Sequence, residues 1–279
     1  MAIFVTEYQY TKMIFHYHKT PIHYHKQGTG PAIVMLHGFL EGSSMWQKIA
    51  AVLSKKNTVL LLDLPGFGQS GMLDKTHTME NMAIMVCELL AFENFQSATL
   101  LGHSMGGYVA LAFGELFPEK LDKLILLNSS PTPDSAARKE NRDRALTIID
   151  KNKAAFITMA IGNLFNAEEK SKYSLAIKGL KNEALHISEN GVRAAIKAMR
   201  DRKDRRTILK NIPCEKHIIA GKLDLIIPLQ DIVRVSKQTN TTLHPIESGH
   251  MSWLTNSPEV IDLLPVSYTH LRAHETGSY

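Results

Sequence analysis

One serine lies in a setting that could make it a nucleophile. Ser104 stands at the centre of the sequence Gly-His-Ser-Met-Gly-Gly, which fits the pattern Gly-x-Ser-x-Gly. The apolar run 98–101 before it predicts a buried strand, and residues 108–117 after it predict a helix that ends before Pro118. A serine at so sharp a strand-to-helix turn is held clear of the backbone, and the turn leaves room only for glycine beside it. The sequence therefore predicts a nucleophile elbow at Ser104.

The main alternative is a glycine-rich turn from some other doubly wound fold. A phosphate-binding loop fits poorly, because neither Gly-Lys-Ser/Thr nor Gly-x-Gly-x-x-Gly follows the predicted strand. A serine hydroxyl is also too weak an acid to attack an ester unaided. The hypothesis of a catalytic serine therefore requires a base and a carboxylate elsewhere in the chain.

His250 is the candidate general base. It follows Gly249 in the loop after the predicted strand 242–246 and precedes the last predicted helix. Among the 13 histidines of the chain, only this one combines a Gly-His pattern with a loop after the final strand. His217 and His244 fall inside predicted strands, so we expect them in the packing of the sheet.

Asp224 is the candidate acid of the same site. It ends the sequence Gly-Lys-Leu-Asp, directly after the predicted strand 217–220 and before Pro228. A carboxylate there would hold the imidazole in the required tautomer and stabilise its protonated form. The alternatives are a helix N-cap role for Asp224 and the neighbouring Asp231, which falls inside the next predicted helix.

Strands and helices alternate around these residues. Strands are predicted at 32–36, 58–62, 98–101 and 121–128, after a hairpin formed by 13–18 and 22–25, and a long helix is predicted at 79–92. The run 32–36 is almost continuously apolar, which is typical of a strand buried on both faces of a parallel sheet. This alternation predicts a doubly wound, mostly parallel sheet with helices on both faces.

The alternation stops after residue 130. Residues 134–210 show only helical periodicity and hold 18 Lys and Arg against 10 Asp and Glu. Strands resume at 217–220, so the helical block is an insertion between two strands of one sheet. We expect it to cover the carboxyl ends of the strands, where open α/β sheets bind ligands.

Composition narrows the class of protein further. No apolar run approaches ~20 residues and the first 17 residues lack a signal-peptide pattern, so we expect a cytoplasmic protein with no membrane segment. The two cysteines, Cys87 and Cys214, lie in apolar segments and are interpreted as reduced core residues.

Two features could suggest other partners. The sequence pI of 9.0 is compatible with nucleic-acid binding, but no nucleic-acid-binding motif accompanies it. Histidines on both arms of the hairpin could bind a metal, but alternation on an exposed strand explains them equally well.

The motifs together resemble the α/β-hydrolase superfamily, in the form with a helical cap inserted after the sixth strand. They occur in the superfamily's order: His37-Gly38-Phe39, Asp-Leu-Pro-Gly-Phe-Gly-Gln-Ser at 63–70, Gly-His-Ser-Met-Gly-Gly at 102–107, Gly-Lys-Leu-Asp at 221–224, and Gly249-His250. The resemblance covers residues 13–264. It implies a hydrolase core at 1–130 and 211–265 and a helical cap at 131–210.

The resemblance also implies roles for individual residues. Ser104, His250 and Asp224 would form the catalytic triad, and the backbone amides of Phe39 and Met105 would form the oxyanion hole. The histidines at 37 and 103 would make local hydrogen bonds, and Asp63 would brace the glycine turn that follows it. No metal and no organic cofactor would be needed.

These roles predict a serine hydrolase that cleaves carboxylic esters of small to medium substrates through an acyl-serine intermediate. Serine at the elbow excludes relatives with an aspartate nucleophile, such as haloalkane dehalogenases. A carbon–carbon bond hydrolase or a menaquinone-pathway-type lyase remains open, although such lyases usually place a basic residue where this chain has Tyr108. A ligand-sensing receptor of the same fold is a third possibility. We expect a small-molecule ester substrate, no nucleic-acid partner, and a monomer or small homo-oligomer.

Two further features concern the substrate. Apolar residues of the cap could roof an acyl pocket or simply pack on the sheet: Ala154, Phe156, Ile157, Ile161, Leu164 and Phe165. The basic run 200–206 could steer acidic acyl carriers or coenzyme A, but the interspersed Asp201 and Asp204 favour a salt-bridged surface.

The two ends of the chain depart from this scheme. Residues before Met13 have no partner in the predicted sheet, so Met13 is a candidate for the true start. The string 266–276 resembles the translation of a sequencing adapter, and no apolar periodicity continues the helix that begins near Pro258. We therefore expect 266–279 to be a non-native tail without function.

Overall fold

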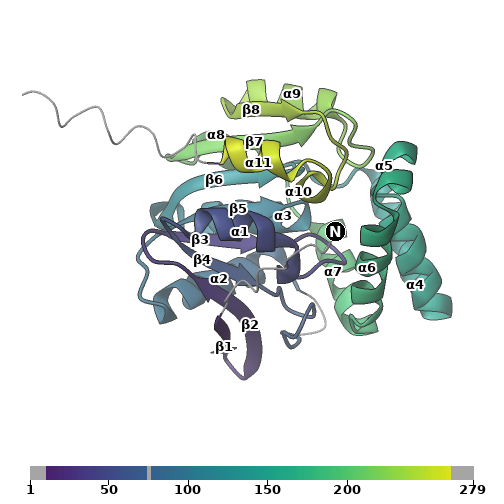
Figure 1. The fold of residues 1–279 in the computed structure, drawn as a ribbon, viewed down its shortest axis with the longest axis horizontal. Coiled ribbons are helices and arrows are strands. Elements are labelled where there is room, and N and C mark those ends of the chain that lie inside the picture. Colours follow the sequence, from purple (N-terminus) through teal and green to yellow (C-terminus); the bar gives the residue numbers. More distant parts are fainter. Residues whose placement is uncertain (1–10, 74–76, 265–279) are drawn as a thin grey trace, which may run out of the picture.

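The fold comes from a computed structural model that describes residues 11–73 and 77–264. The proposed non-native tail at 266–279 and the segment before Thr11 lie outside these residues. The prediction that residues before Met13 have no partner in the sheet is wrong for Thr11 and Lys12, which pair with Lys26 and His25. Figure 1 shows a twisted sheet with helices on both faces and a group of helices beyond one end of the strands.

The sheet has eight strands in the order β1-β2-β4-β3-β5-β6-β7-β8. Their bounds are β1 Thr11–Tyr17, β2 Thr20–Gln27, β3 Ala32–Leu36, β4 Thr58–Leu62, β5 Ala98–His103, β6 Leu121–Leu127, β7 Glu215–Gly221 and β8 Thr242–Ile246. β1 and β2 form an antiparallel hairpin, β2 pairs antiparallel with β4, and every other pairing is parallel. The predicted α/β class with a mostly parallel sheet is confirmed.

Burial explains this arrangement of strands. Every residue of β3, β4 and β5 is buried, as the apolar runs predict for strands covered on both faces. The outer strand β1 is largely exposed, so its polar residues face solvent. The hairpin turns at His18 and Lys19, one position earlier than predicted, because Tyr17 pairs with Thr20 and Pro21 already lies in β2.

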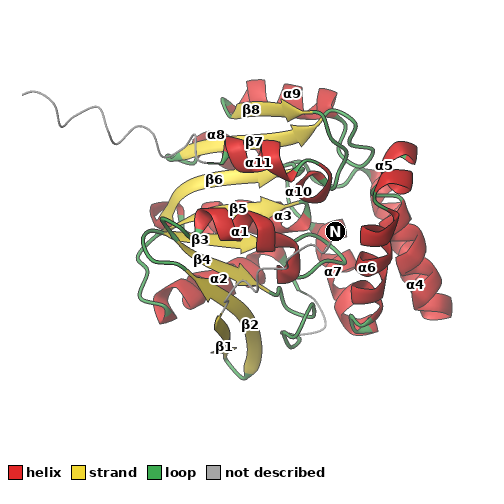
Figure 2. Ribbon diagram, in the orientation of Figure 1, coloured by secondary structure: helices red, strands yellow, loops and turns green. Residues whose placement is uncertain are grey.

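Helices cover the two faces of the sheet (Figures 1 and 2). α1 Gln47–Leu53, α10 Ser252–Thr255 and α11 Ser257–Leu263 pack together on one face, next to the 3-10 turn η1 Ser43–Trp46. α2 Met79–Phe92, α3 Met105–Leu116, α8 Arg206–Asn211 and α9 Leu229–Thr239 form the layer on the other face. A second 3-10 turn, η2 Pro118–Lys120, joins α3 to β6. Cys87 is buried in α2, whereas Cys214, just before β7, is only half-buried.

Five helices of the described chain lie between β6 and β7 in sequence, and the first four of them lie at the carboxyl ends of the strands (Figure 1). These four are α4 Ala136–Gly162, α5 Ala167–Lys172, α6 Ser174–Leu185 and α7 Glu189–Asp201. α4 packs against α6 and α7. It bends at Asn152, which has non-helical torsion angles and caps the second half by accepting a hydrogen bond from the Ala155 amide.

The topology brings distant loops to one edge of the sheet. β3 and β5 are hydrogen-bonded neighbours, so the loops that follow them, which begin at His37 and Ser104, start side by side. β6, β7 and β8 follow in parallel, so the loops after them open at the same edge. None of the helices in the described ranges has the length and apolarity that crossing a lipid bilayer requires.

Candidate active site

The turn at Ser104 has the geometry of a nucleophile elbow. Ser104 has a φ of 48° and a ψ of −111°, a backbone conformation that residues other than glycine rarely adopt. The Cβ of an alanine at position 106 would lie 2.2 Å from the Leu36 carbonyl oxygen, so only glycine allows β3 and α3 to approach so closely. The amide of Ser104 donates to the Leu127 carbonyl at 3.0 Å, and the Ser129 hydroxyl donates to the Ser104 carbonyl at 2.7 Å. These bonds fix the strained turn.

The structure brings the three predicted triad residues together. Nε2 of His250 lies 3.0 Å from Oγ of Ser104, and Nδ1 of His250 lies 2.8 Å from Oδ2 of Asp224. An ionised carboxylate only accepts, so Nδ1 carries the proton and Nε2 is left to accept from the serine hydroxyl. This tautomer is the one that a general base needs.

Asp224 is buried and its carboxylate is fully engaged. Oδ1 accepts from the amides of Ile226 and Ile227, at 2.8 and 2.9 Å, and Oδ2 accepts from the side-chain amide of Asn128 at 3.0 Å as well as from His250. Burial raises the pKa of this carboxyl, but the His250 charge and these hydrogen bonds outweigh burial and hold the pKa below its ordinary value. Asp224 therefore stays ionised beside His250.

Asn128 is a site residue that the sequence reasoning missed. Its side-chain amide donates both to Asp224 and to the Gly249 carbonyl, at 3.1 Å for the latter, and its oxygen accepts from the Ser252 hydroxyl. Asn128 follows β6, where the sequence offered no carboxylate. The asparagine instead links the acid loop to the histidine loop.

Two backbone amides near the serine were predicted to form the oxyanion hole, those of Phe39 and Met105. Neither the Phe39 amide nor the Met105 amide has a hydrogen-bond acceptor among the described residues. The Met105 amide opens helix α3, whose first N–H groups have no partner within the helix. Phe39 and Ser104 line the same cavity. Beside this cavity, both amides thus remain without an acceptor in the part of the chain that the structure describes.

A buried ion pair lies beneath these loops. Nδ1 of His103 is 2.9 Å from Oε2 of Glu41, and Nε2 of His103 is 3.0 Å from the carbonyl oxygen of His250. Glu41 also accepts from the Gly38 amide at 2.6 Å and from the indole N–H of Trp253 at 3.1 Å. With Glu41 ionised, both ring nitrogens of His103 face acceptors, an arrangement that a doubly protonated imidazolium satisfies.

The pKa shifts agree with this assignment. Burial disfavours both charges, but each partner's charge and hydrogen bonds outweigh burial, so the pKa of Glu41 is lowered and the pKa of His103 is raised. The pair holds Gly38, next to one candidate oxyanion donor, and the backbone of the candidate base. The predicted local role of His103 is confirmed, whereas Glu41 was not singled out from the sequence.

Two other sequence predictions are confirmed by hydrogen bonds. His37 accepts from the Leu64 amide through Nε2, at 2.9 Å, and its Nδ1 lies 2.8 Å from the Gly38 carbonyl oxygen. Asp63 accepts from the amides of Ser43 and Gln69, at 2.9 and 3.0 Å, and so braces the glycine turn. His217 and His244 are half-buried and stack on each other on β7 and β8.

The inserted helices also contribute a contact to the histidine loop. The buried Glu169 of α5 accepts from the Gly249 amide at 2.9 Å, next to His250, and from the Asn166 amide at 3.0 Å. The latter bond belongs to a capping box, because the Asn166 side chain accepts from the Glu169 amide in turn. Tyr173 donates to the Thr255 carbonyl at 2.9 Å on the same side. The docking of α5 and the position of the candidate base are therefore coupled.

Glu169→Ala is expected to destabilise the protein by about 1–3 kcal/mol, because the buried Gly249 amide and the Asn166 amide both lose their acceptor. We also expect kcat to fall several-fold, since the histidine loop is no longer fixed. Urea unfolding and steady-state kinetics would measure both effects. Glu169→Gln keeps an acceptor oxygen and should restore most of kcat. The exposed neighbour provides the control: if Glu168→Ala has the same effect, the coupling is contradicted.

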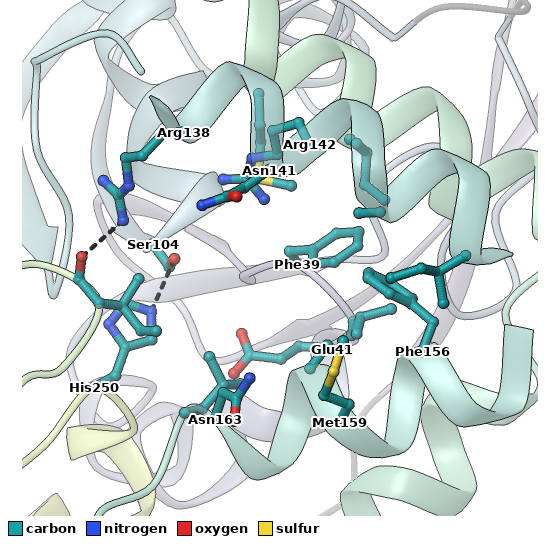
Figure 3. Close-up of a pocket in the computed structure, with 18 of the residues that line it drawn as sticks. Phe39, Glu41, Ser104, Arg138, Asn141, Arg142, Phe156, Met159, Asn163 and His250 are labelled. Atoms are coloured by element: carbon teal, nitrogen blue, oxygen red, sulfur yellow. Dashed lines mark hydrogen bonds between the residues drawn. The ribbon is translucent and has the colours of Figure 1, made fainter. Parts of the chain in front are cut away.

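A cavity of about 490 Å³ opens onto the serine. Figure 3 shows Ser104 and His250 at one side of it and Phe156 at the opposite end, with Phe39 between them. Of the six apolar residues of the insertion singled out from the sequence, Phe156 and Leu164 line the cavity. Ile157, Ile161 and Phe165 are buried in packing instead. Each interpretation therefore holds for some members of the set. Ala154 is exposed and does not line the cavity, so neither interpretation holds for it.

The basic run 200–206 is salt-bridged, as its interspersed aspartates indicated. Its ion pairs are Arg200 with Asp143 and Asp201, Arg202 with Asp134, Lys203 with Glu80, Arg205 with Glu80 and Glu115, and Arg206 with Asp204. In the part of the chain that the structure describes, no cluster of three or more His, Cys, Asp or Glu could hold a metal ion.

Known proteins resemble the chain in sequence and structure. Residues 31–257 match the family model described as alpha/beta hydrolase fold. A thermophilic esterase from Thermogutta terrifontis, solved with malate bound, superposes with a TM-score of 0.85 at 26% identity, over 93% of this chain and 97% of that chain. The pimeloyl-[acyl-carrier protein] methyl ester esterase of Pseudoalteromonas atlantica is 27% identical over 258 residues, which span 85% of this chain and 94% of that protein. An uncharacterised Mycobacterium tuberculosis protein is 36% identical over 102 residues, so that match spans only 30% of the relative's length.

Proposed function

Because the chain belongs to the alpha/beta hydrolase fold family and is a hydrolase, we propose that it cleaves carboxylic esters of small to medium substrates through an acyl-Ser104 intermediate. The observation that carries the proposal is the continuous hydrogen-bonded series from Ser104 through His250 to Asp224. A strained serine that donates to a correctly oriented imidazole is the arrangement that activates a hydroxyl nucleophile.

The geometry supports a two-step acyl transfer. Oγ of Ser104 attacks the ester carbonyl carbon while Nε2 of His250 takes the hydroxyl proton, and Asp224 stabilises the resulting imidazolium. The carbonyl oxygen becomes an oxyanion that accepts from the amides of Phe39 and Met105. The bond between the acyl carbon and the alcohol oxygen then breaks, and His250 gives its proton to that leaving oxygen. Water, deprotonated by His250, attacks the acyl-serine and releases the carboxylic acid and the free Ser104.

The relatives favour ester cleavage over other uses of the same triad. Two of the similar proteins are esterases, one of them named for a methyl ester. The position that suits a basic residue in the lyase alternative is filled by Tyr108, whose ring is covered by the Arg202 guanidinium at 4.1 Å from the ring centroid. A carbon–carbon bond hydrolase would use the same residues and differs in the substrates it accepts.

The proposal is tested with the purified wild-type protein. We expect it to release p-nitrophenol from short p-nitrophenyl acyl esters. Esters of increasing acyl chain length and a set of lactones would then define which substrates it hydrolyses. A fluorophosphonate probe should block this activity and add its mass to the tryptic peptide that contains Ser104. Labelling of a different residue, or turnover confined to carbon–carbon bond substrates, would contradict the ester assignment.

A further inference from the structure

One arginine of the active-site cavity differs from every other described arginine. The structure describes nine arginines, and eight of them form ion pairs with carboxylates: Arg142, Arg144, Arg193, Arg200, Arg202, Arg205, Arg206 and Arg234. Arg138 is the ninth. Among the described residues no carboxylate lies within ion-pair distance of its guanidinium.

Arg138 is half-buried and lies next to the reacting groups. It belongs to the first turn of α4, and its Nη2 donates to the carbonyl oxygen of Ile226 at 2.7 Å. The amide of Ile226 is in turn bound by Asp224. Figure 3 shows the Arg138 side chain beside Ser104 and His250, at the same end of the cavity. A guanidinium has five N–H donors, so the single bond to Ile226 leaves several for a ligand.

The other charged residues of the cavity lining are each paired with an opposite charge. Arg142 and Arg144 follow on the same helix and also line the cavity. Each has a carboxylate partner, Asp134 and Glu140 respectively. Glu41 is the one acidic residue of the lining, and its charge is matched by His103. The guanidinium of Arg138 is therefore a cation without a counter-ion at the cavity wall.

The opposite end is apolar. Phe156 and Met159 line it, and the ring of Phe39 packs against Phe156 with ring centroids 6.4 Å apart (Figure 3). A ligand that fills the cavity must therefore present hydrocarbon to one end. It can place an anionic group at the other end, next to the serine.

We propose that Arg138 binds an anionic group of the substrate, a carboxylate or a phosphate, so that the enzyme prefers esters that carry an acid group close to the ester bond. The inference rests on the proposed ester hydrolysis and specifies its substrate class. Guanidinium groups pair with both anions through two parallel hydrogen bonds, which neutral esters cannot offer.

The test compares charged and neutral esters of equal length. Monoethyl succinate and ethyl 4-oxopentanoate form the carboxylate arm, because the neutral ester has a methyl group in place of one carboxylate oxygen. The butyryl ester of 2-hydroxyethyl phosphate and the butyryl ester of 2-methoxyethanol form the phosphate arm. For wild type, KM is expected to be lower for the acidic member of at least one arm. Arg138→Met should raise that KM about 10- to 100-fold and leave KM for the neutral member within about twofold. Arg138→Lys keeps the charge but not the two parallel N–H donors of the guanidinium, so its KM for the acidic ester should lie between those of wild type and Arg138→Met.

Lys139→Met is the matched control, because it removes the same charge from the next residue, which is exposed and outside the cavity lining. Equal KM values for acidic and neutral esters in wild type would overturn the inference. So would an equal rise for both in Arg138→Met, because an arginine that only anchors the Ile226 loop would affect all substrates alike.

Binding separates this inference from the proposed function. Monoethyl succinate and the phosphate ester are titrated calorimetrically into Ser104→Ala, with and without Arg138→Met. Arg138-dependent binding in a protein whose wild type cleaves no ester would contradict the proposed function and support the anion site. Cleavage of neutral esters without Arg138-dependent binding would contradict the anion site alone.

Discussion

Ser104→Ala is expected to lower kcat/KM for p-nitrophenyl esters by about 10⁴- to 10⁶-fold and to change the free energy of unfolding by about 1 kcal/mol or less. The loss follows because no other hydroxyl is hydrogen-bonded to His250 among the described residues. The fold persists because the bonds that hold the elbow use the Ser104 backbone, which alanine retains. Steady-state kinetics and urea unfolding of the purified variant would measure the two effects.

His250→Ala should lose activity to a similar extent, and the double variant should lose little more than either single one. Nucleophile and base act as a unit, so removing the second has little further effect once the first is gone. His244→Ala is the matched control, because His244 lies on β8, contacts His217 on the neighbouring strand β7 and does not line the cavity. Additive losses in the double variant, or a retained activity of several per cent in Ser104→Ala, would contradict the assignment.

The positions of these residues could be predicted from the sequence because short motifs and strand ends coincide. Ser104, Asp224 and His250 directly follow, or lie a few residues beyond, strands β5, β7 and β8, which the apolar runs mark. Parallel strands place their carboxyl ends at one edge, so residues far apart in the chain must meet there. The short motifs, together with the rule that parallel strands end at one edge of the sheet, were therefore sufficient to predict that Ser104, Asp224 and His250 lie close together.

The supporting contacts have no such local signal. Glu41 and His103 are 62 residues apart, Asn128 and Asp224 are 96 apart, and Glu169 and Gly249 are 80 apart. From the sequence alone, a glutamate in a loop is expected to be exposed to solvent, because charged residues are rarely buried. Only the assembled fold buries Glu41. The helical periodicity of 134–210 likewise predicted helices, but it did not show which face of α4 would turn Arg138 toward the serine.

Glu41→Ala is expected to be the most destabilising single change at the site. It leaves the His103 imidazolium buried without its counter-ion and removes the acceptor of the Gly38 and Trp253 N–H groups. Removing one partner of a buried ion pair typically costs about 3–5 kcal/mol. We also expect kcat to fall, because Gly38 precedes the Phe39 amide and His103 holds the His250 carbonyl. Urea unfolding at pH 6 and kinetics on a p-nitrophenyl ester would test these effects.

The dependence on pH distinguishes a charged pair from simple packing. The pKa of Glu41 is lowered on folding, so its contribution to stability is present above its unfolded pKa of about 4.3 and is lost as pH falls through the folded value. The pKa of His103 is raised, so its contribution is complete below its unfolded pKa of about 6.5 and is lost as pH rises through the folded value. The pair therefore stabilises most between about pH 4.5 and 6.5.

The pH dependence of Glu41→Gln isolates this electrostatic contribution, because glutamine keeps the shape but not the charge. Its NH2 group must face the N–H of either Trp253 or Gly38, which adds a destabilisation that does not vary with pH. The stability difference between wild type and Glu41→Gln should be largest near pH 5.5 and should shrink as pH rises through the folded pKa of His103. Glu140→Gln is the control, since it breaks the exposed pair with Arg144 and should cost about 0.5 kcal/mol or less. A difference for Glu41→Gln that stays constant from pH 5.5 to 9 would mean that His103 and Glu41 are held as a neutral hydrogen-bonded pair. In that case the oxyanion loop and the histidine loop would be fixed by packing and hydrogen bonds rather than by charge.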